Sequence, residues 1–166
     1  MVRPILTDAR ISELLKVDKA VTFASKRGSE KGKHVEWDFD LESNDGVKFT
    51  VFVRENSMLD DDFSCGLCWA SPSGESVILA RYNGGSHPHP NRIEGTKLPM
   101  HAHVHRATER YMKAGRPDGY AEPTDLYSDI GGALSSLIQE CSISGIESLP
   151  GKKTPRNPRQ LRLWEN

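Results

Sequence analysis

Alternating apolar and acidic residues over positions 35–42 constrain the fold of this chain more than any other feature. Apolar side chains stand at every second position and carboxylates fill the places between them, a period typical of a β-strand with one buried face. The Asp-Gly pair at residues 45–46 favours a tight hairpin turn, and residues 47–53 resume the alternation. The two strands are therefore predicted to pair antiparallel.

The four carboxylates of the first strand form a row on its predicted solvent-facing side. Lys48, Thr50 and Arg54 of the second strand are expected to lie opposite this row. Cross-strand charge pairing, rather than a metal ion, then explains the acidic residues.

Two more strands and two helices are predicted around this hairpin. Residues 63–70 and 77–82 have strand character and are joined by a turn at 72–75. Thr7 and Asp8 can begin an N-terminal helix, and Asp125 or Ser128 can cap a C-terminal helix that extends to Cys141. The predicted fold class is α+β, an antiparallel β-meander of four to six strands packed against an N-terminal and a C-terminal helix.

The 166 residues suit one domain, which we predict over residues 1–145. Residues 146–166 are basic and contain three prolines, so we expect an extended or disordered tail that can engage a protein partner. A formal net charge of -1 gives no overall attraction to nucleic acid, and any such binding must be local.

No segment has the roughly 18 apolar residues of a membrane-spanning helix, and the N-terminal residues do not have the pattern of a signal peptide. We therefore expect a cytoplasmic location and no membrane partner. The three cysteines, Cys65, Cys68 and Cys141, are interpreted as reduced thiols, because an odd number argues against a disulfide framework.

Five of the six histidines lie between residues 87 and 105, which is the strongest chemical signal in the sequence. His87 and His89 fall in a loop rich in proline and glycine. The other three, at positions 101, 103 and 105, fit either a strand or a helix. We favour a strand to about Arg106, followed by a short helix or turn through Lys113.

These histidines suggest acid-base chemistry more than metal binding. Side chains at alternate strand positions lie roughly 6.5 to 7 Å apart, so three from one strand seldom bind the same ion. The sequence therefore predicts no metal and no cofactor. Imidazole titrates near neutral pH, and arginines beside it can hold a phosphate, which suits metal-independent cleavage of RNA or a nucleotide phosphodiester.

Candidate site residues follow from that chemistry. The predicted catalytic residues are His103, His105, Arg106, Glu109, Arg110 and Tyr111. The predicted substrate-binding residues are Arg81, Tyr82, Asn83, His87 and Arg92. RNA or a nucleotide phosphate is the expected ligand.

Residues 101–107 locally resemble the motif of the histidine triad nucleotide hydrolases and transferases, in which three histidines alternate with apolar residues. In that family the middle histidine attacks the α-phosphorus of a nucleotide, and His103 holds that position here. Arg106 departs from the apolar residue of the motif, and about 60 residues follow where the family's domain normally ends.

A longer resemblance covers residues 11–143. Its segments are Arg-Tyr-Asn-Gly at 81–84, Asn-Arg-Ile-Glu-Gly at 91–95, His-Val-His-Arg-Ala-Thr-Glu-Arg-Tyr at 103–111 and Tyr-Ala-Glu-Pro-Thr-Asp at 120–125, with residues 62–67. They resemble an uncharacterised family of short, toxin-like bacterial proteins. The resemblance implies a small toxin-like or defence-associated protein.

The alternative is a non-catalytic inhibitor or interaction module, for example an anti-defence protein of a phage or mobile element. In that case the histidine loop and the basic tail would bind a protein partner.

Overall fold

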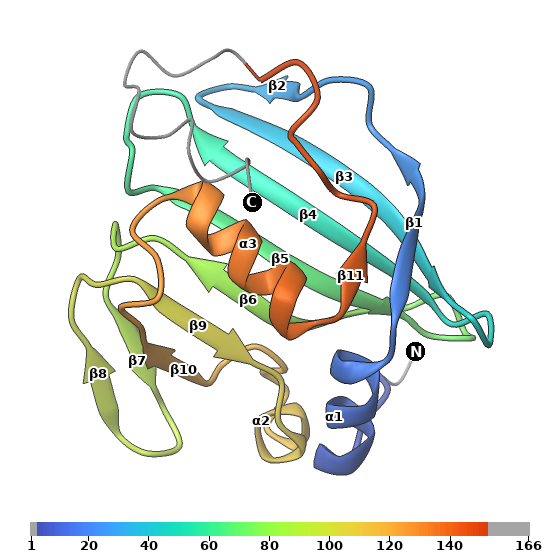
Figure 1. The fold of residues 1–166 in the computed structure, drawn as a ribbon. Helices are drawn as coiled ribbons and strands as arrows, with labels where there is room; N and C mark the ends of the chain where they lie inside the picture. Colours follow the sequence, from blue (N-terminus) through green and yellow to red (C-terminus); the bar gives the residue numbers. More distant parts are fainter. Residues whose placement is uncertain (1–2, 153–166) are drawn as a thin grey trace.

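A computed structural model describes residues 3–152 of the chain. It is an α+β protein in which three helices accompany a large mixed sheet (Figure 1). No helix in these residues is long and apolar enough to cross a membrane. Residues 153–166, most of the predicted tail, lie outside the described part.

The main sheet has nine strands, so it is larger than the four to six strands expected. Its order is β10-β9-β6-β5-β4-β3-β1-β11, with β2 also paired to β3. The strands are β1 (Lys19–Ala24), β2 (Ser29–Lys31), β3 (His34–Ser43), β4 (Lys48–Asn56), β5 (Phe63–Ala70), β6 (Ser76–Asn83), β9 (His103–Arg106), β10 (Ala121–Pro123) and β11 (Ile143–Ser144). A separate two-stranded sheet contains β7 (His89–Asn91) and β8 (Thr96–Leu98).

The hairpin of β3 and β4 forms as predicted. Glu36 lies opposite Arg54 and Glu42 opposite Lys48 in the antiparallel register. Arg54 Nε is 3.6 Å from Glu36 Oε1, so the expected cross-strand charge pairing is present. Gly46 closes the turn with a φ of 83°, a conformation that glycine adopts without strain.

Extra strands come from segments distant in the sequence. β11 pairs with β1 in parallel, and β9 and β10 extend the other edge beyond β6. The parallel pair makes the sheet mixed, which the predicted antiparallel meander does not include.

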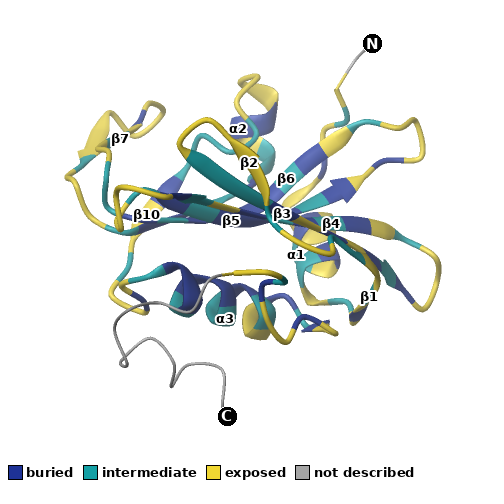
Figure 2. Cartoon of the chain, turned by 90° about the horizontal axis from the view of Figure 1, so that it is seen from above, coloured by how far each residue is buried: buried dark blue, intermediate teal, exposed yellow. Residues whose placement is uncertain are grey.

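One face of the sheet carries the hydrophobic core beneath α3 (Ile130–Glu140), as Figures 1 and 2 show. Asp129, and not the predicted Asp125 or Ser128, caps the helix by accepting from Gly132 N. Leu134 and Leu137 of this helix are fully buried. α1 (Asp8–Lys16) begins after the predicted cap Thr7, whose side chain accepts from Arg10 N.

The predicted strand-to-helix change near residue 106 is confirmed. β9 ends at Arg106 and α2 (Glu109–Lys113) follows. The side chain of Thr108 caps this short helix by accepting from Tyr111 N.

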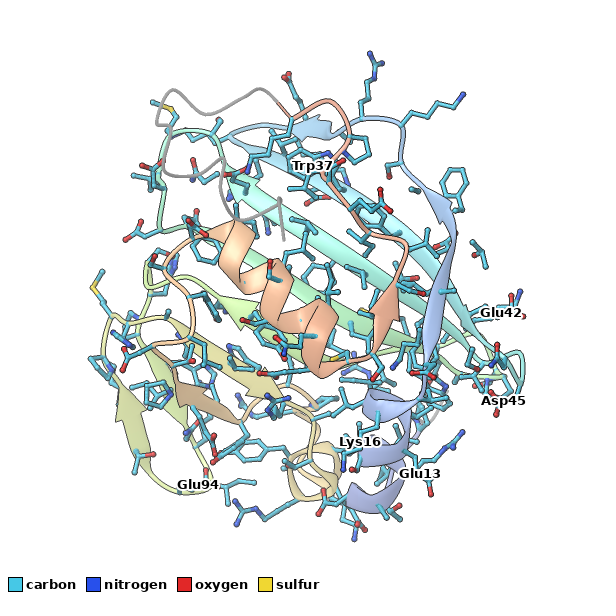
Figure 3. The ribbon with its side chains drawn as sticks, viewed as in Figure 1. Glu13, Lys16, Trp37, Glu42, Asp45 and Glu94 are labelled. Atoms are coloured by element: carbon cyan, nitrogen blue, oxygen red, sulfur yellow. The ribbon has the colours of Figure 1, made fainter. Side chains whose placement is uncertain are left out.

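The first residues of the predicted tail pack on the domain. Ile146 and Leu149 are buried in the core cluster. Trp37, which Figure 3 labels beneath this segment, donates through Nε1 to Pro150 O at 2.9 Å. Residues 146–149 therefore add to the apolar cover of the sheet.

Candidate functional site

The sheet face opposite α3 carries rows of polar side chains, because direct cross-strand partners point to the same side. Arg54 pairs with Ser64, Ser64 with Asn83, and Asn83 with His103. The neighbouring core row, which includes Tyr82 and Val104, is buried on the α3 side. Four strands thus place one polar row across the sheet.

A second row lies beside the first on the same face. Gly66 pairs with Arg81, and Arg81 pairs with His105. The glycine has no side chain, and an added Cβ would stand 2.6 Å from the ring of Phe52. The two rows together bring Arg81, His103 and His105 to the same part of the sheet.

A cavity of about 100 Å³ opens at these rows. Its polar lining includes His34, Arg54, Asp62, Arg81, His87 and His103. Ser64 and Asn83 of the first row also line it. The volume is comparable to about three water molecules of the liquid, and therefore to one phosphate group rather than a whole nucleotide.

His34 is held between a carboxylate and a guanidinium at one side of the cavity. Its Nε2 is 3.2 Å from Asp62 Oδ2, and its Nδ1 is 3.2 Å from Arg54 Nη2. Because a guanidinium only donates, Nδ1 accepts from Arg54 and Nε2 carries the hydrogen shared with Asp62. The hydrogen bond from Asn56 holds the pKa of Asp62 below its ordinary value, so this carboxylate is ionised at neutral pH.

Arg81 lies at the other side of the cavity. Its Nη2 is 3.1 Å from Asp118 Oδ2, and 29% of its side chain is exposed. Its buried Nε has no hydrogen-bond partner among the described residues. This buried donor is therefore unsatisfied within the described residues.

Next to the cavity, three imidazoles form a cluster: His89, His103 and His105. The ring centroids of His89 and His105 are 4.5 Å apart, and those of His103 and His105 are 5.0 Å apart. One nitrogen of each ring lies within 4.8 Å of one nitrogen of each other ring, a spacing from which they could hold a metal ion. His103 belongs both to this cluster and to the cavity wall.

Each ring in the cluster bonds a backbone carbonyl through one nitrogen. His103 Nδ1 and His105 Nδ1 bond His101 O at 2.8 Å and Asp118 O at 2.7 Å. His89 Nε2 bonds Gly119 O at 2.8 Å. A carbonyl only accepts, so the bonded nitrogen is the protonated one.

His103 and His105 are neutral at physiological pH. Burial lowers the pKa of His105 to about 3, and the nearby charge of Arg81 acts in the same direction. Burial also lowers the pKa of His103. Neutral imidazoles of this kind accept a proton poorly but keep a lone pair for a donor or a metal.

The structure brings together four of the eleven predicted site residues at the cavity: Arg81, Asn83, His87 and His103. His105 lies in the adjacent cluster. His101, by contrast, turns away and bonds Asp125 Oδ1 at 2.8 Å. The third member of the cluster is instead His89, from the predicted loop, which forms β7.

The other predicted residues lie apart from His103, so the six expected catalytic residues do not form one site. Arg106 and Tyr82 point to the α3 face, where both bond Glu140. Strand alternation explains this, because Arg106 follows His105 and must face the opposite side.

The α2 residues also bind elsewhere. Glu109 pairs with Lys113, and Arg110 and Tyr111 bond Glu94 in the connection between β7 and β8 (Figure 3). Arg92 is an exposed residue of the same connection.

His34, Arg54 and Asp62 were not among the predicted site residues. They precede the histidine-rich stretch by 25 residues or more, and only the strand order brings them to it. The available signal was Arg54, which alternation places on the polar face of β4.

Comparisons of the chain with protein-family models, with curated proteins and with solved structures find no match. The geometry of the cavity and the histidine cluster therefore carries the functional argument.

Proposed function

We propose that the chain binds a phosphodiester of RNA or of a nucleotide at the cavity and cleaves it without a metal ion. The observation that carries the proposal is the presence of two arginines and a His–Asp pair, Arg54, Arg81, His34 and Asp62, around one cavity of about 100 Å³. As a small RNA-cleaving protein, the chain would act as a toxin or a defence-associated protein.

Phosphate binding is the first step. Two guanidiniums on opposite sides of the cavity can donate to phosphate oxygens, and charge-assisted bonds of this type are stronger than neutral ones. The side chain of Arg81 is 29% exposed, so its guanidinium can reach such an oxygen. Ser64 and Asn83 add neutral hydrogen-bonding groups to the lining.

Proton transfer follows from the tautomer of His34. A phosphate oxygen that takes the N–H of Arg54 releases His34 Nδ1, which then has a free lone pair. Nδ1 removes the proton of the ribose 2′-hydroxyl, and that oxygen attacks phosphorus. Asp62 stabilises the imidazolium that forms.

The leaving group takes a proton from the exposed His87, which is another residue of the cavity lining. The P–O5′ bond breaks as the P–O2′ bond forms. The products are a 2′,3′-cyclic phosphate and a free 5′-hydroxyl. The two arginines stabilise the charge that develops on the phosphate oxygens.

The test is cleavage of a labelled RNA oligonucleotide in the presence of a chelator, with the product ends identified by mass spectrometry. His34→Gln and Arg81→Met are expected to reduce the rate by about 100-fold or more, the usual contribution of an acid-base or charge-stabilising group. Arg10→Met is the matched control, because Arg10 is an exposed residue of α1 that pairs with Glu13.

A wild-type chain that leaves RNA and dinucleotide phosphodiesters intact refutes the proposal. So does cleavage that survives both substitutions. Cleavage that requires an added metal refutes the metal-independent mechanism.

A further inference from the structure

We propose that His89, His103 and His105 bind one divalent transition-metal ion, of the class to which Zn²⁺, Co²⁺ and Ni²⁺ belong. This site adjoins the arginine cavity and shares His103 with its wall, but the proposal does not depend on phosphodiester cleavage. It assigns a ligand to the part of the histidine-rich stretch that the proposed mechanism leaves unused.

The tautomers are those of metal-binding histidines. Each ring donates one N–H to a backbone carbonyl, at 2.7 to 2.8 Å. Metal-ligating histidines commonly do the same, because the second hydrogen bond fixes the ring and leaves the other nitrogen unprotonated. The unprotonated atoms here are His89 Nδ1, His103 Nε2 and His105 Nε2.

The hydrogen bonds inside the cluster do not satisfy all of these lone pairs. Asn83 Nδ2 is 3.2 Å from His105 Nε2 and 3.5 Å from His103 Nε2, so its two N–H groups can serve these two rings. Among the described residues no hydrogen bond reaches His89 Nδ1, because His89 bonds Gly119 O through Nε2. The same amide has a buried Oδ1 without a partner among the described residues. Buried polar atoms are normally paired, so this arrangement calls for a further group.

A metal ion would accept the three lone pairs, and a rotation of the Asn83 amide by 180° would turn Oδ1 towards it as a fourth ligand. Amide oxygen and nitrogen exchange places in such a rotation without other movement.

The three histidines do not all come from one strand, where three side chains on the same face are too far apart to bind one ion. Only His103 and His105 come from β9, and His89 reaches them from β7. Nitrogen ligands 2.0 to 2.1 Å from a tetrahedral zinc lie about 3.3 Å from one another. The three imidazole nitrogens lie within 4.8 Å of one another, so the rings must move closer together to bind zinc. The hairpin of β7 and β8 is a separate two-stranded sheet, which lets His89 move inward.

The charges near the three histidines and the chemistry of their imidazole ligands indicate which ions can bind. Arg81 is the nearby cation, and Asp118 at 3.1 Å balances it. Three imidazoles without a carboxylate suit zinc, cobalt, nickel or copper, whereas magnesium and calcium require oxygen ligands.

The experiment measures metal binding to the full chain after chelator treatment. Zn²⁺ is titrated in competition with a chromophoric chelator, and Co²⁺ is followed by its visible absorption. We expect one equivalent per chain. His89→Ala should weaken binding by about 100-fold or more, since even the loss of an outer hydrogen-bonding partner costs 10- to 100-fold.

The matched controls are His87→Ala and His101→Ala, two histidines of the same stretch outside the cluster. Both should bind Zn²⁺ within about 3-fold of wild type, well below the loss expected for a ligand. The metal-free melting temperature of His89→Ala shows whether this variant folds, and Zn²⁺ should raise the melting temperature of wild type but not of the variant.

Two results would overturn the metal site. The first is that Zn²⁺, Co²⁺ and Ni²⁺ do not bind wild type more tightly than about 1 mM, an affinity of about 4 kcal/mol. The second is a folded His89→Ala variant that binds like wild type. His34→Gln separates the two proposals, because it should lose RNA cleavage and keep metal binding.

Discussion

Lys19 offers a sharp test of how the fold is held together. Its side chain is almost fully buried, with 2% of the residue exposed. Nζ donates to Leu15 O at 2.9 Å, to Val17 O at 2.7 Å and to Cys141 O at 2.7 Å. Val17 and Cys141 are the C-caps of α1 and α3, so one ammonium group satisfies carbonyls at the ends of two helices.

Replacing Lys19 with Met removes these bonds and keeps most of the side-chain volume. A buried acceptor left without a donor costs about 1 to 3 kcal/mol, but burying the ammonium itself costs several kcal/mol, and the variant avoids that cost. The three lost hydrogen bonds destabilise the variant, and the avoided desolvation of the ammonium partly offsets that loss. We therefore expect the free energy of unfolding to fall by about 3 kcal/mol at pH 7. The exposed Lys16→Met on α1 should change it by less than about 0.5 kcal/mol.

The pH dependence of stability tests independently whether the pKa of Lys19 is lowered in the folded protein. Burial lowers the pKa of Lys19 from 10.5 to about 8. Between these values the unfolded chain holds more protons than the folded chain, so the stability contributed by Lys19 rises with pH. The difference between wild type and Lys19→Met should grow by about 1.3 kcal/mol from pH 7 to pH 9.

Urea denaturation followed by circular dichroism at both pH values measures these quantities. A loss below about 1 kcal/mol at pH 7 would refute the role of the three carbonyl bonds. A difference that shrinks from pH 7 to pH 9 would refute the lowered pKa, because it would mean that the carbonyls favour the charged form more than burial opposes it.

Three further substitutions test other parts of the fold. Gly66→Ala should destabilise by about 2 kcal/mol in urea denaturation, since its Cβ would stand 2.6 Å from the ring of Phe52. Arg106→Met should lose about 1 kcal/mol or less by the same assay, because its bond to Glu140 is partly exposed, and it should leave RNA cleavage unchanged since it faces α3. Asp62→Asn should destabilise at pH 7, and the loss should diminish in acid denaturation below about pH 4, because the lowered pKa of Asp62 stabilises the fold only while the carboxylate is ionised.

Local patterns were enough to predict much of the fold. The alternation and the Asp-Gly turn predicted the hairpin of β3 and β4, and the capping residue Thr7 predicted the start of α1. The short strands at the sheet edges had no such signal. β11 has two residues, and its pairing with β1 joins Lys19 to Ile143, a contact that the packing of the chain sets rather than its local sequence.

The candidate site was harder to predict because it depends on strand order. The pattern placed His103 and His105 on one side of a strand, but the same alternation sends Arg106 to the other side, which excludes a shared site. Arg54 reaches the cavity only because β4, β5, β6 and β9 are neighbours in register. No spacing within the sequence contains that information.

The change in burial along the polar face explains why the two proposed sites have different chemistry. The side chain of Arg54 is 50% exposed and that of Arg81 is 29% exposed, so both cations stay in contact with water. His103 and His105 are only 3% and 2% exposed. They lie where the ring of His89 from β7 packs against β9. A charged group at that depth would lose its hydration, whereas a neutral imidazole keeps its lone pair. The covered end of the face therefore suits a divalent transition-metal ion, and its open end suits a phosphate.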